Sequence, residues 1–172
     1  PSSFIISPTI NTSYKILSVV DNKGCSNSFS RSTFLAVNEI PNVNISGDNE
    51  ICEGEISQLY FNFTSGTGPW KVDYSTNGNF TSGNLSNTFD SISIIPNSST
   101  NYNFTSISDL NCTKSINEQI KIIVNPVGKS TISGGGSICN DGQDAEIFIN
   151  TSSGTPPFDI EYSVGTQTKI LS

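Results

Sequence analysis

One stretch of this sequence occurs twice, and the duplication constrains what the chain can fold into. Residues 65–75 read SGTGPWKVDYS and residues 153–163 read SGTPPFDIEYS, with six of the eleven positions identical. The second copy begins 88 residues after the first. Self-similarity at a fixed spacing of this size is the sequence signature of a repeat array. The chain is therefore predicted to consist of repeats with a period of 87 to 88 residues.

This period divides the chain into one complete repeat and two halves. Residues 41–127 form the complete unit, residues 1–40 match its C-terminal half, and residues 128–172 match its N-terminal half. Joined end to end, the two halves would make a unit of nearly the length of the complete one. We therefore expect the 172 residues to represent about two periods of a long, near-periodic polymer.

Short runs of alternating apolar and polar residues predict β-strands in all three units. Leu59, Phe61 and Phe63 alternate with Gln58, Tyr60 and Asn62, as in a strand that buries one face. No stretch has a helical period. Seven such strands at a spacing of roughly 8–12 residues indicate a β-sandwich. The predicted fold is all-β, with tandem immunoglobulin-like seven-strand antiparallel β-sandwiches arranged head to tail.

Four aromatic residues are predicted to lie in the cores of these sandwiches. Trp70 and Phe158 begin the third strand of their units, where immunoglobulin-like sandwiches commonly keep a core aromatic. Tyr14 and Tyr102 open the sixth strand, at positions that suit a structural tyrosine corner. The alternative for Trp70 and Phe158 is an exposed platform for a ligand. Core packing is favoured because Val72 continues the face of Trp70.

The cysteines predict covalent links between repeats. Cys25, Cys52, Cys112 and Cys139 are spaced by 27, 60 and 27 residues, which gives two cysteine sites per repeat. No C-x-x-C pair suggests zinc, so disulfides and an oxidising extracellular setting are favoured. Cys52 lies in the first turn of its unit and Cys112 in the sixth, at opposite ends of an up-and-down sandwich. A Cys52–Cys112 bond is therefore not expected, since a disulfide needs Cα atoms within about 7 Å.

Head-to-tail stacking would bring the first turn of one repeat against the sixth turn of the next. We predict that Cys52 pairs with the Cys25-like site of the following repeat. Cys112 would pair with the Cys139-like site of the preceding repeat. Such links would resist bending and pulling.

The charge balance and the residue types exclude several function classes. Eight Lys and Arg against 15 Asp and Glu give a net charge of −7, so a basic nucleic-acid footprint is absent. No run of 18 apolar residues predicts a membrane span, and the opening PSSFIISPT does not have the form of a signal peptide. Histidine is absent, which removes Ser-His and Cys-His nucleophile pairs. The sequence predicts no enzyme and no cofactor.

An acidic loop near the start of the complete unit is a weak candidate for a metal site. Asp48, Glu50 and Glu53 lie close together in sequence, and calcium takes several carboxylate and carbonyl ligands. The spacing does not match an EF-hand, and a solvated acidic loop is the favoured interpretation.

Several motifs together resemble a known group of bacterial repeats. The combination comprises SGxxxIC(x)G at 46–54, GTGPWxVxYS at 66–75 and PxxxTxYxxTSxxDxNC at 96–112. It looks like the immunoglobulin-like or PKD-like repeats of giant cell-surface adhesins of Bacteroidota. The DNKGC turn at 21–25 resembles a turn in the repeats of gliding-motility adhesins. The chain departs from the pattern where Pro156 replaces Gly68.

This resemblance implies a function outside the cell. It implies export by the type 9 secretion system, anchoring at the outer membrane, and a long filament at the cell surface for adhesion or gliding. The expected partners are neighbouring repeats of the same polypeptide or filament, with surface glycans or a substratum as further partners. The resemblance also implies O-glycosylation at an Asp-Ser/Thr-aliphatic motif, which Asp90-Ser91-Ile92 matches.

Two functions from different classes therefore remain open. The first is the repetitive shaft of a surface adhesin, which predicts tight junctions and no deep pocket. The second is an accessory carbohydrate-binding sandwich of a secreted enzyme, which predicts exposed aromatics along one face. A solvent-exposed row of Tyr60, Phe80 and Tyr74 would favour the second.

Overall fold

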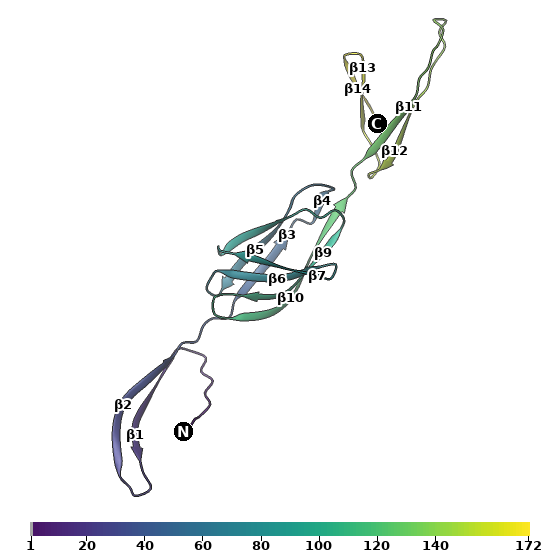
Figure 1. Ribbon diagram of the computed structural model, residues 1–172. Helices are drawn as coiled ribbons and strands as arrows, with labels where there is room; N and C mark the ends of the chain where they lie inside the picture. The colour runs from purple at the N-terminus through teal and green to yellow at the C-terminus, as the bar shows by residue number, and fades with distance from the viewer. Residues whose placement is uncertain (1) are drawn as a thin grey trace.

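Every regular element is a β-strand in the computed structural model, which describes residues 2–172 (Figure 1). The strands are β1 (Thr12–Val20), β2 (Ser26–Leu35), β3 (Asn42–Gly47), β4 (Glu50–Cys52), β5 (Ser57–Ser65), β6 (Trp70–Thr76), β7 (Asn79–Leu85), β8 (Phe89–Ile94), β9 (Thr100–Ser108), β10 (Thr113–Asn125), β11 (Lys129–Gly134), β12 (Ile147–Ser153), β13 (Ile160–Val164) and β14 (Gln167–Leu171). The high content of Ser, Thr and Asn agrees with this, since these residues compete with helices through local backbone hydrogen bonds.

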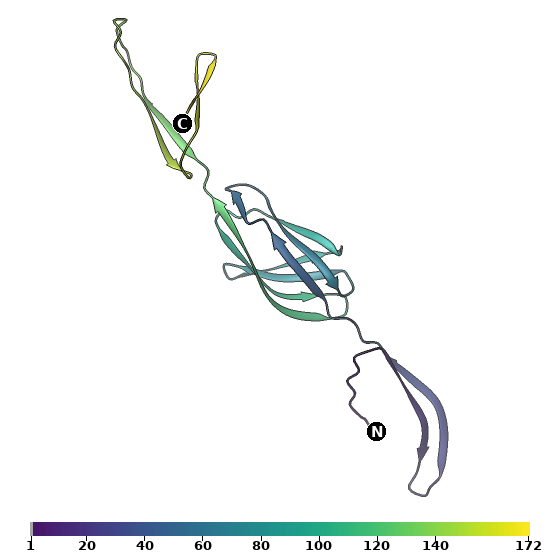
Figure 2. The same ribbon diagram turned by 180° about the vertical axis from the view of Figure 1, so that it is seen from behind.

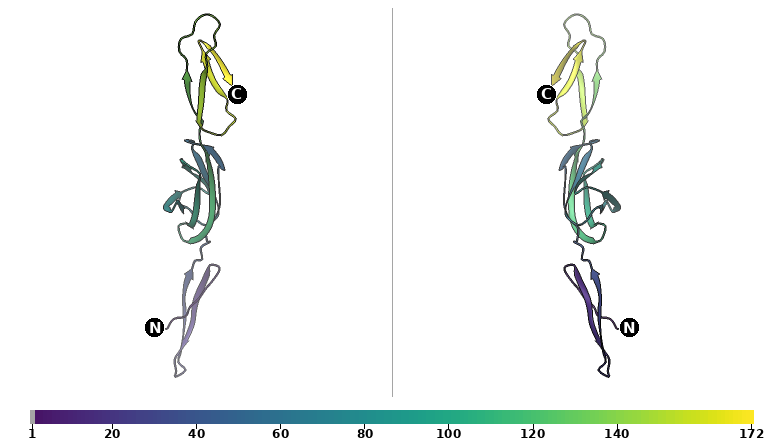
Figure 3. Two further views of the ribbon diagram at one scale, coloured as in Figure 1. Left: turned by 90° about the vertical axis from the view of Figure 1, so that its right-hand side faces the viewer. Right: turned by 90° about the vertical axis from the view of Figure 1, so that its left-hand side faces the viewer.

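The strands form three segments that follow one another along one line (Figures 1 and 2). A hairpin of β1 and β2 comes first. Strands β3 to β10 make the central segment, and β11 to β14 make the last one as two separate two-stranded sheets. Views from the side show the same linear order (Figure 3). The central segment alone has two sheets that enclose a core.

The central segment is built from a three-stranded and a five-stranded sheet. The strand orders are β3-β5-β8 and β4-β10-β9-β6-β7. Inward-facing residues alternate along β5, β6 and β9, and together they form one hydrophobic cluster. Its buried members are Ile51, Leu59, Phe61, Phe63, Trp70, Val72, Tyr74, Leu85, Tyr102, Phe104, Ile107 and Ile122.

Residues 41–127 hold eight strands rather than the seven predicted, and one pairing is parallel. The additional strand is β4, which lies in the segment that reads as a polar loop. It pairs parallel with the end of β10, with Ile51 opposite Val124. The polar pattern concealed this strand because Ile51 is its one buried side chain. The chain therefore passes from β3 in one sheet to β4 in the other sheet, and it returns to the first sheet with β5.

The two outer segments repeat the strand registers of the central one. β1 pairs with β2 as β9 pairs with β10, and the register shift after Ile16 recurs after Phe104. In the last segment, Ile132 lies opposite Ile149 in the same way that Ile45 lies opposite Phe61. The domain boundaries themselves stay a prediction, and Pro1 lies outside the described residues.

The four predicted core aromatics differ in burial. Trp70 and Tyr102 are buried in the central cluster. Tyr14 and Phe158 are only partly buried. In the outer segments each sheet lacks the facing sheet that would cover it, so the burial of Tyr14 and Phe158 within a complete repeat stays a prediction.

Candidate functional site

The candidate functional regions are the two ends of the central segment, where neighbouring segments join it. At the entry end, the Ser65 hydroxyl donates a hydrogen bond of 2.7 Å to the carbonyl oxygen of Ile40. At the next junction the Ser153 hydroxyl donates one of 2.6 Å to the carbonyl oxygen of Val127. The same contact therefore recurs at both junctions with the spacing of the sequence repeat, and it ties the first linker to β5 and the second linker to β12.

Asp109 organises the entry end. Its Oδ2 accepts a hydrogen bond of 2.8 Å from the Thr67 amide, and its Oδ1 accepts bonds of 2.8 and 2.6 Å from the amides of Asn111 and Cys112. Burial acts to raise the pKa of Asp109, but the three amide donors outweigh it and hold that pKa below the ordinary value. One carboxylate thus connects the turn that carries Cys112 to the duplicated stretch at residues 65–75.

Asp21 holds the corresponding turn in the first hairpin. Its Oδ1 accepts hydrogen bonds of 2.9 Å from the amides of Lys23 and Cys25. The sequence motifs at 21–25 and 96–112 each contain the aspartate of such a turn, but they did not reveal that the carboxylate builds the turn. The signal was present, because aspartate side chains commonly accept bonds from amides two or three residues on.

Strand β4 forms the exit end together with the last residues of β10. The Ile123 amide donates to the carbonyl oxygen of Asn49 at 2.9 Å, and the Glu53 amide donates to that of Asn125 at 2.8 Å. The Asn125 side-chain amide also donates to the Glu50 carboxylate. These hydrogen bonds hold residues 49–53 against β10, the strand through which the chain leaves the central segment.

The two central cysteines lie at opposite ends of β10. Cys112 immediately precedes this strand, and Cys52 pairs with its last residue, Asn125. Thirteen residues of strand extend about 40 Å, far beyond the reach of a disulfide. All four cysteines of the chain are free thiols in this structure. The predicted links to neighbouring repeats remain predictions.

The acidic residues of the first loop are engaged in separate contacts. Asp48 accepts a hydrogen bond of 2.8 Å from the Gln58 amide, while Glu50 contacts Asn125. Glu53 is exposed. Within residues 2–172 there is no group of three His, Cys, Asp or Glu side chains that could hold a metal ion.

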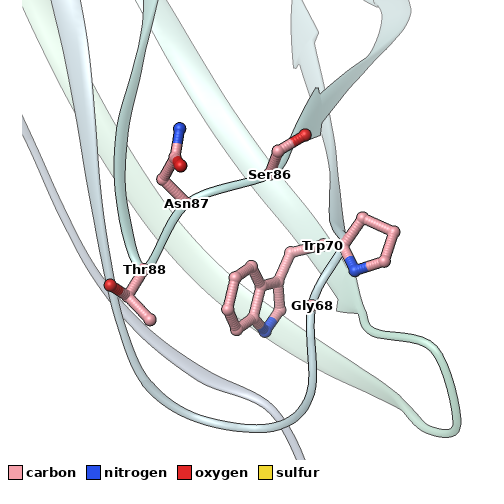
Figure 4. Close-up of a pocket in the computed structure, with 6 residues that line it drawn as sticks. Gly68, Trp70, Ser86, Asn87 and Thr88 are labelled. Carbon is pink, nitrogen blue, oxygen red and sulfur yellow. The ribbon is translucent and has the colours of Figure 1, made fainter.

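An open hollow lies beside Trp70 at the entry end (Figure 4). Its walls are Gly68, Pro69 and Trp70 on one side and residues 86–88 on the other. The indole ring stacks on Phe63 with ring centroids 4.5 Å apart, so the ring belongs to the core rather than forming a ligand platform. Its Nε1 is buried and has no hydrogen-bond partner among the described residues.

The aromatics proposed for a carbohydrate face do not form a row. Tyr74 is buried in the core, and Phe80 projects from β7. Tyr60 lies in the other sheet, where it stacks on exposed Phe89 with ring centroids 6.3 Å apart. A single aromatic pair is therefore presented on the outer side of the β3-β5-β8 sheet.

Ser91, the predicted O-glycosylation site, is exposed on β8. The adjacent Asp90 accepts hydrogen bonds from the amides of Ser86, Asn87 and Ser91. The Ser86, Ser91 and Asn87 amides lower the pKa of Asp90. The aspartate of the motif is thus structural, and modification of Ser91 stays a prediction.

Comparisons with known proteins do not assign the chain to a family. Neither the models of protein families nor the curated proteins give a match. The described part of the chain contains no helix long and apolar enough to cross a membrane.

Proposed function

We propose that this chain is a structural segment in the shaft of a large secreted bacterial cell-surface adhesin that serves surface adhesion or gliding. One observation carries the proposal: the chain enters the central segment at one end, beside Asp109, and leaves it at the other, beside β4. Repeats connected in this way add length along one axis (Figure 1). Each junction also repeats the same serine contact to its linker.

The strand order supports an immunoglobulin-like sandwich for each repeat. The chain pairs β3 with β5 and β8 in one sheet, and β10, β9 and β6 in the other. Immunoglobulin-like domains group their first, second and fifth strands apart from their third, sixth and seventh strands in this manner. We infer a tandem, head-to-tail array of such domains.

The exit end suits a shaft under tension. A force that pulls the two chain ends apart acts along the parallel strands β4 and β10. Two backbone hydrogen bonds, one between Asn49 and Ile123 and one between Glu53 and Asn125, are then loaded in shear and must break together. Hydrogen bonds that are loaded one at a time, as at the open end of a hairpin, would break at a lower force.

Single-molecule force spectroscopy on the whole chain tests this role. Glu53→Pro removes the amide donor to Asn125, whereas Glu53→Ala keeps it. We expect the proline variant to lower the unfolding force of the central segment and the alanine variant to leave it unchanged. Equal unfolding forces in all three proteins would contradict a mechanical role for β4.

The proposed location is extracellular, at the cell surface, with neighbouring repeats as the main partners. Cys52 and Cys112 are placed at the two ends of the central segment, where a neighbouring repeat would meet them. We propose that they form inter-repeat disulfides there, in an oxidising setting.

The second candidate is an accessory carbohydrate-binding module, favoured by the exposed Tyr60–Phe89 pair. Aromatic rings provide apolar faces on which sugar rings can stack. A glycan array probed with this chain and with Phe89→Ala separates the two functions. Binding that disappears in the variant would favour the module, and absence of binding would favour the shaft.

A further inference from the structure

One exposed turn of the central segment joins two residues that can react with each other. Asn77 and Gly78 connect β6 to β7, and of the twenty asparagines in the chain Asn77 alone is followed by glycine. Both residues are exposed, and their φ angles of +50° and +83° suit a two-residue hairpin loop. We propose that Asn77 is a self-modification site, at which the chain converts its own asparagine into aspartate and isoaspartate.

The reaction needs only these two residues and water. The main-chain nitrogen of Gly78 attacks Cγ of Asn77, so that a bond forms between these two atoms and the bond from Cγ to Nδ2 breaks. The Gly78 nitrogen gives up its proton, and the side-chain amide leaves as ammonia. Water then opens the five-membered succinimide ring at either of its two carbonyl groups, which yields aspartate or isoaspartate.

The surroundings of the turn favour this attack. Gly78 has no Cβ to hinder the approach of its nitrogen, and the space around it is open, since a Cβ built there would meet nothing within 4 Å. The Gly78 amide donates to no backbone acceptor within residues 2–172. Ring closure requires the turn to leave its resting conformation. This costs little at the tip of an edge hairpin, and β7 is an edge strand.

The two turns that carry Cys25 and Cys112 hold the corresponding nitrogen in place. The amide that follows Asn111 donates to Asp109 Oδ1 at 2.6 Å. The amide that follows Asn22 donates to Asp21 Oδ1 at 2.9 Å. A carboxylate on the N–H disfavours loss of its proton, because the amide anion would then lie against a negative charge. These two turns are therefore protected, whereas the turn at Asn77 is not.

The last segment builds the same hairpin without an asparagine. Gly165 and Thr166 join β13 to β14, and the strands on either side pair as they do around Asn77 and Gly78. A two-residue loop at this place in the repeat therefore does not require the reactive pair. The counterpart turn also supplies a replacement that keeps the hairpin and removes the reaction.

The products would change the central segment only locally. Each of them puts a carboxylate in place of a neutral amide. Isoaspartate also carries the main chain through Cβ, which lengthens the loop by one atom and opposes the pairing of Thr76 with Asn79. Strand β7 lies at one edge of the five-stranded sheet and β4 at the other. The modification is therefore remote from the hydrogen bonds proposed to bear force, and it does not depend on the shaft role.

Incubation of the whole chain in mildly alkaline buffer tests the proposal. Peptide mass spectrometry locates the conversion of each asparagine, and methylation by an isoaspartyl methyltransferase detects isoaspartate. We expect both products to accumulate at residue 77 ahead of residues 22 and 111. The rate should rise with pH, because the anion of the Gly78 amide is the nucleophile.

The matched control replaces the turn by its counterpart, with Asn77→Gly and Gly78→Thr in one variant. This variant should lose methyl acceptance at the turn, while fluorescence of Trp70, the one tryptophan, verifies that the central segment remains folded. Asp21→Ala removes the carboxylate from the exposed turn of the first hairpin. It should raise the conversion of Asn22 above that in the wild type.

Three results would overturn the self-modification of Asn77. They are conversion at residue 77 no faster than at residues 22 and 111, aspartate without isoaspartate, and equal methyl acceptance in the wild type and the replaced turn. Aspartate alone would mean direct hydrolysis of the side chain without a ring. Unchanged conversion of Asn22 in Asp21→Ala would overturn the protective role of the turn aspartates.

Discussion

Gly66 provides the sharpest test of how the entry junction is built. Its φ is +93°, a conformation that costs an L-residue about 1–2 kcal/mol. A Cβ at this position would lie 2.6 Å from the Asp109 carboxylate and 3.0 Å from the Pro41 backbone. Gly78 has a φ of +83°, and a Cβ added there would meet nothing within 4 Å, so Gly78 shares the backbone cost without the crowding.

We therefore expect Gly66→Ala to destabilise the central segment more than Gly78→Ala. The control should cost about 1–2 kcal/mol from backbone strain. Gly66→Ala should cost a further 1–3 kcal/mol, or roughly 2–5 in all, because the linker and the carboxylate must move apart. Urea unfolding followed by Trp70 fluorescence measures both values. Equal losses in the two variants would show that the linker does not pack closely against Gly66.

Two further predictions concern the core and the pH dependence. Ile107→Ala should lower the free energy of unfolding by about 2–5 kcal/mol in the same urea assay, whereas exposed Asn101→Ala should change it by less than about 0.5; similar losses would contradict a core centred on β9. The hydrogen bond from Lys71, aided by two serine hydroxyls, lowers the pKa of Asp73 to about 2 from 3.8. The ionised Asp73 carboxylate therefore stabilises the fold above pH 3.8, and this stabilisation is lost as the pH falls towards 2. The free energy of unfolding, measured across this pH range, should depend less on pH in Asp73→Asn than in the wild type.

The alternating pattern was enough to predict most strands, because each of these strands buries one face and exposes the other. Leu59, Phe61 and Phe63 illustrate this, since all three point into the core. Strand β4 could not be predicted in this way. It is three residues long, and its parallel partner β10 lies about 70 residues away in the sequence.

The candidate junctions were predictable only in part. The cysteine spacing indicated two sites at opposite ends of a repeat, and the structure separates Cys52 and Cys112 by the length of β10. The role of Asp109 in its own turn had a local signal, but its hydrogen bond from the Thr67 amide was not predictable, because Thr67 lies in a distant loop. Contacts of this kind depend on the packing of one loop against another and leave no local pattern.

The period of the repeated stretch and the all-β character could both be read from the order of residues. They follow from local alternation and self-similarity, which require no knowledge of distant contacts. Which side chains are covered became clear only from the packing of the sheets. Trp70 and Phe158 occupy the same position in the two copies of the duplicated stretch, yet Trp70 is buried and Phe158 is only partly buried. Burial depends on a second sheet, and the central segment is the one described segment in which both sheets are present.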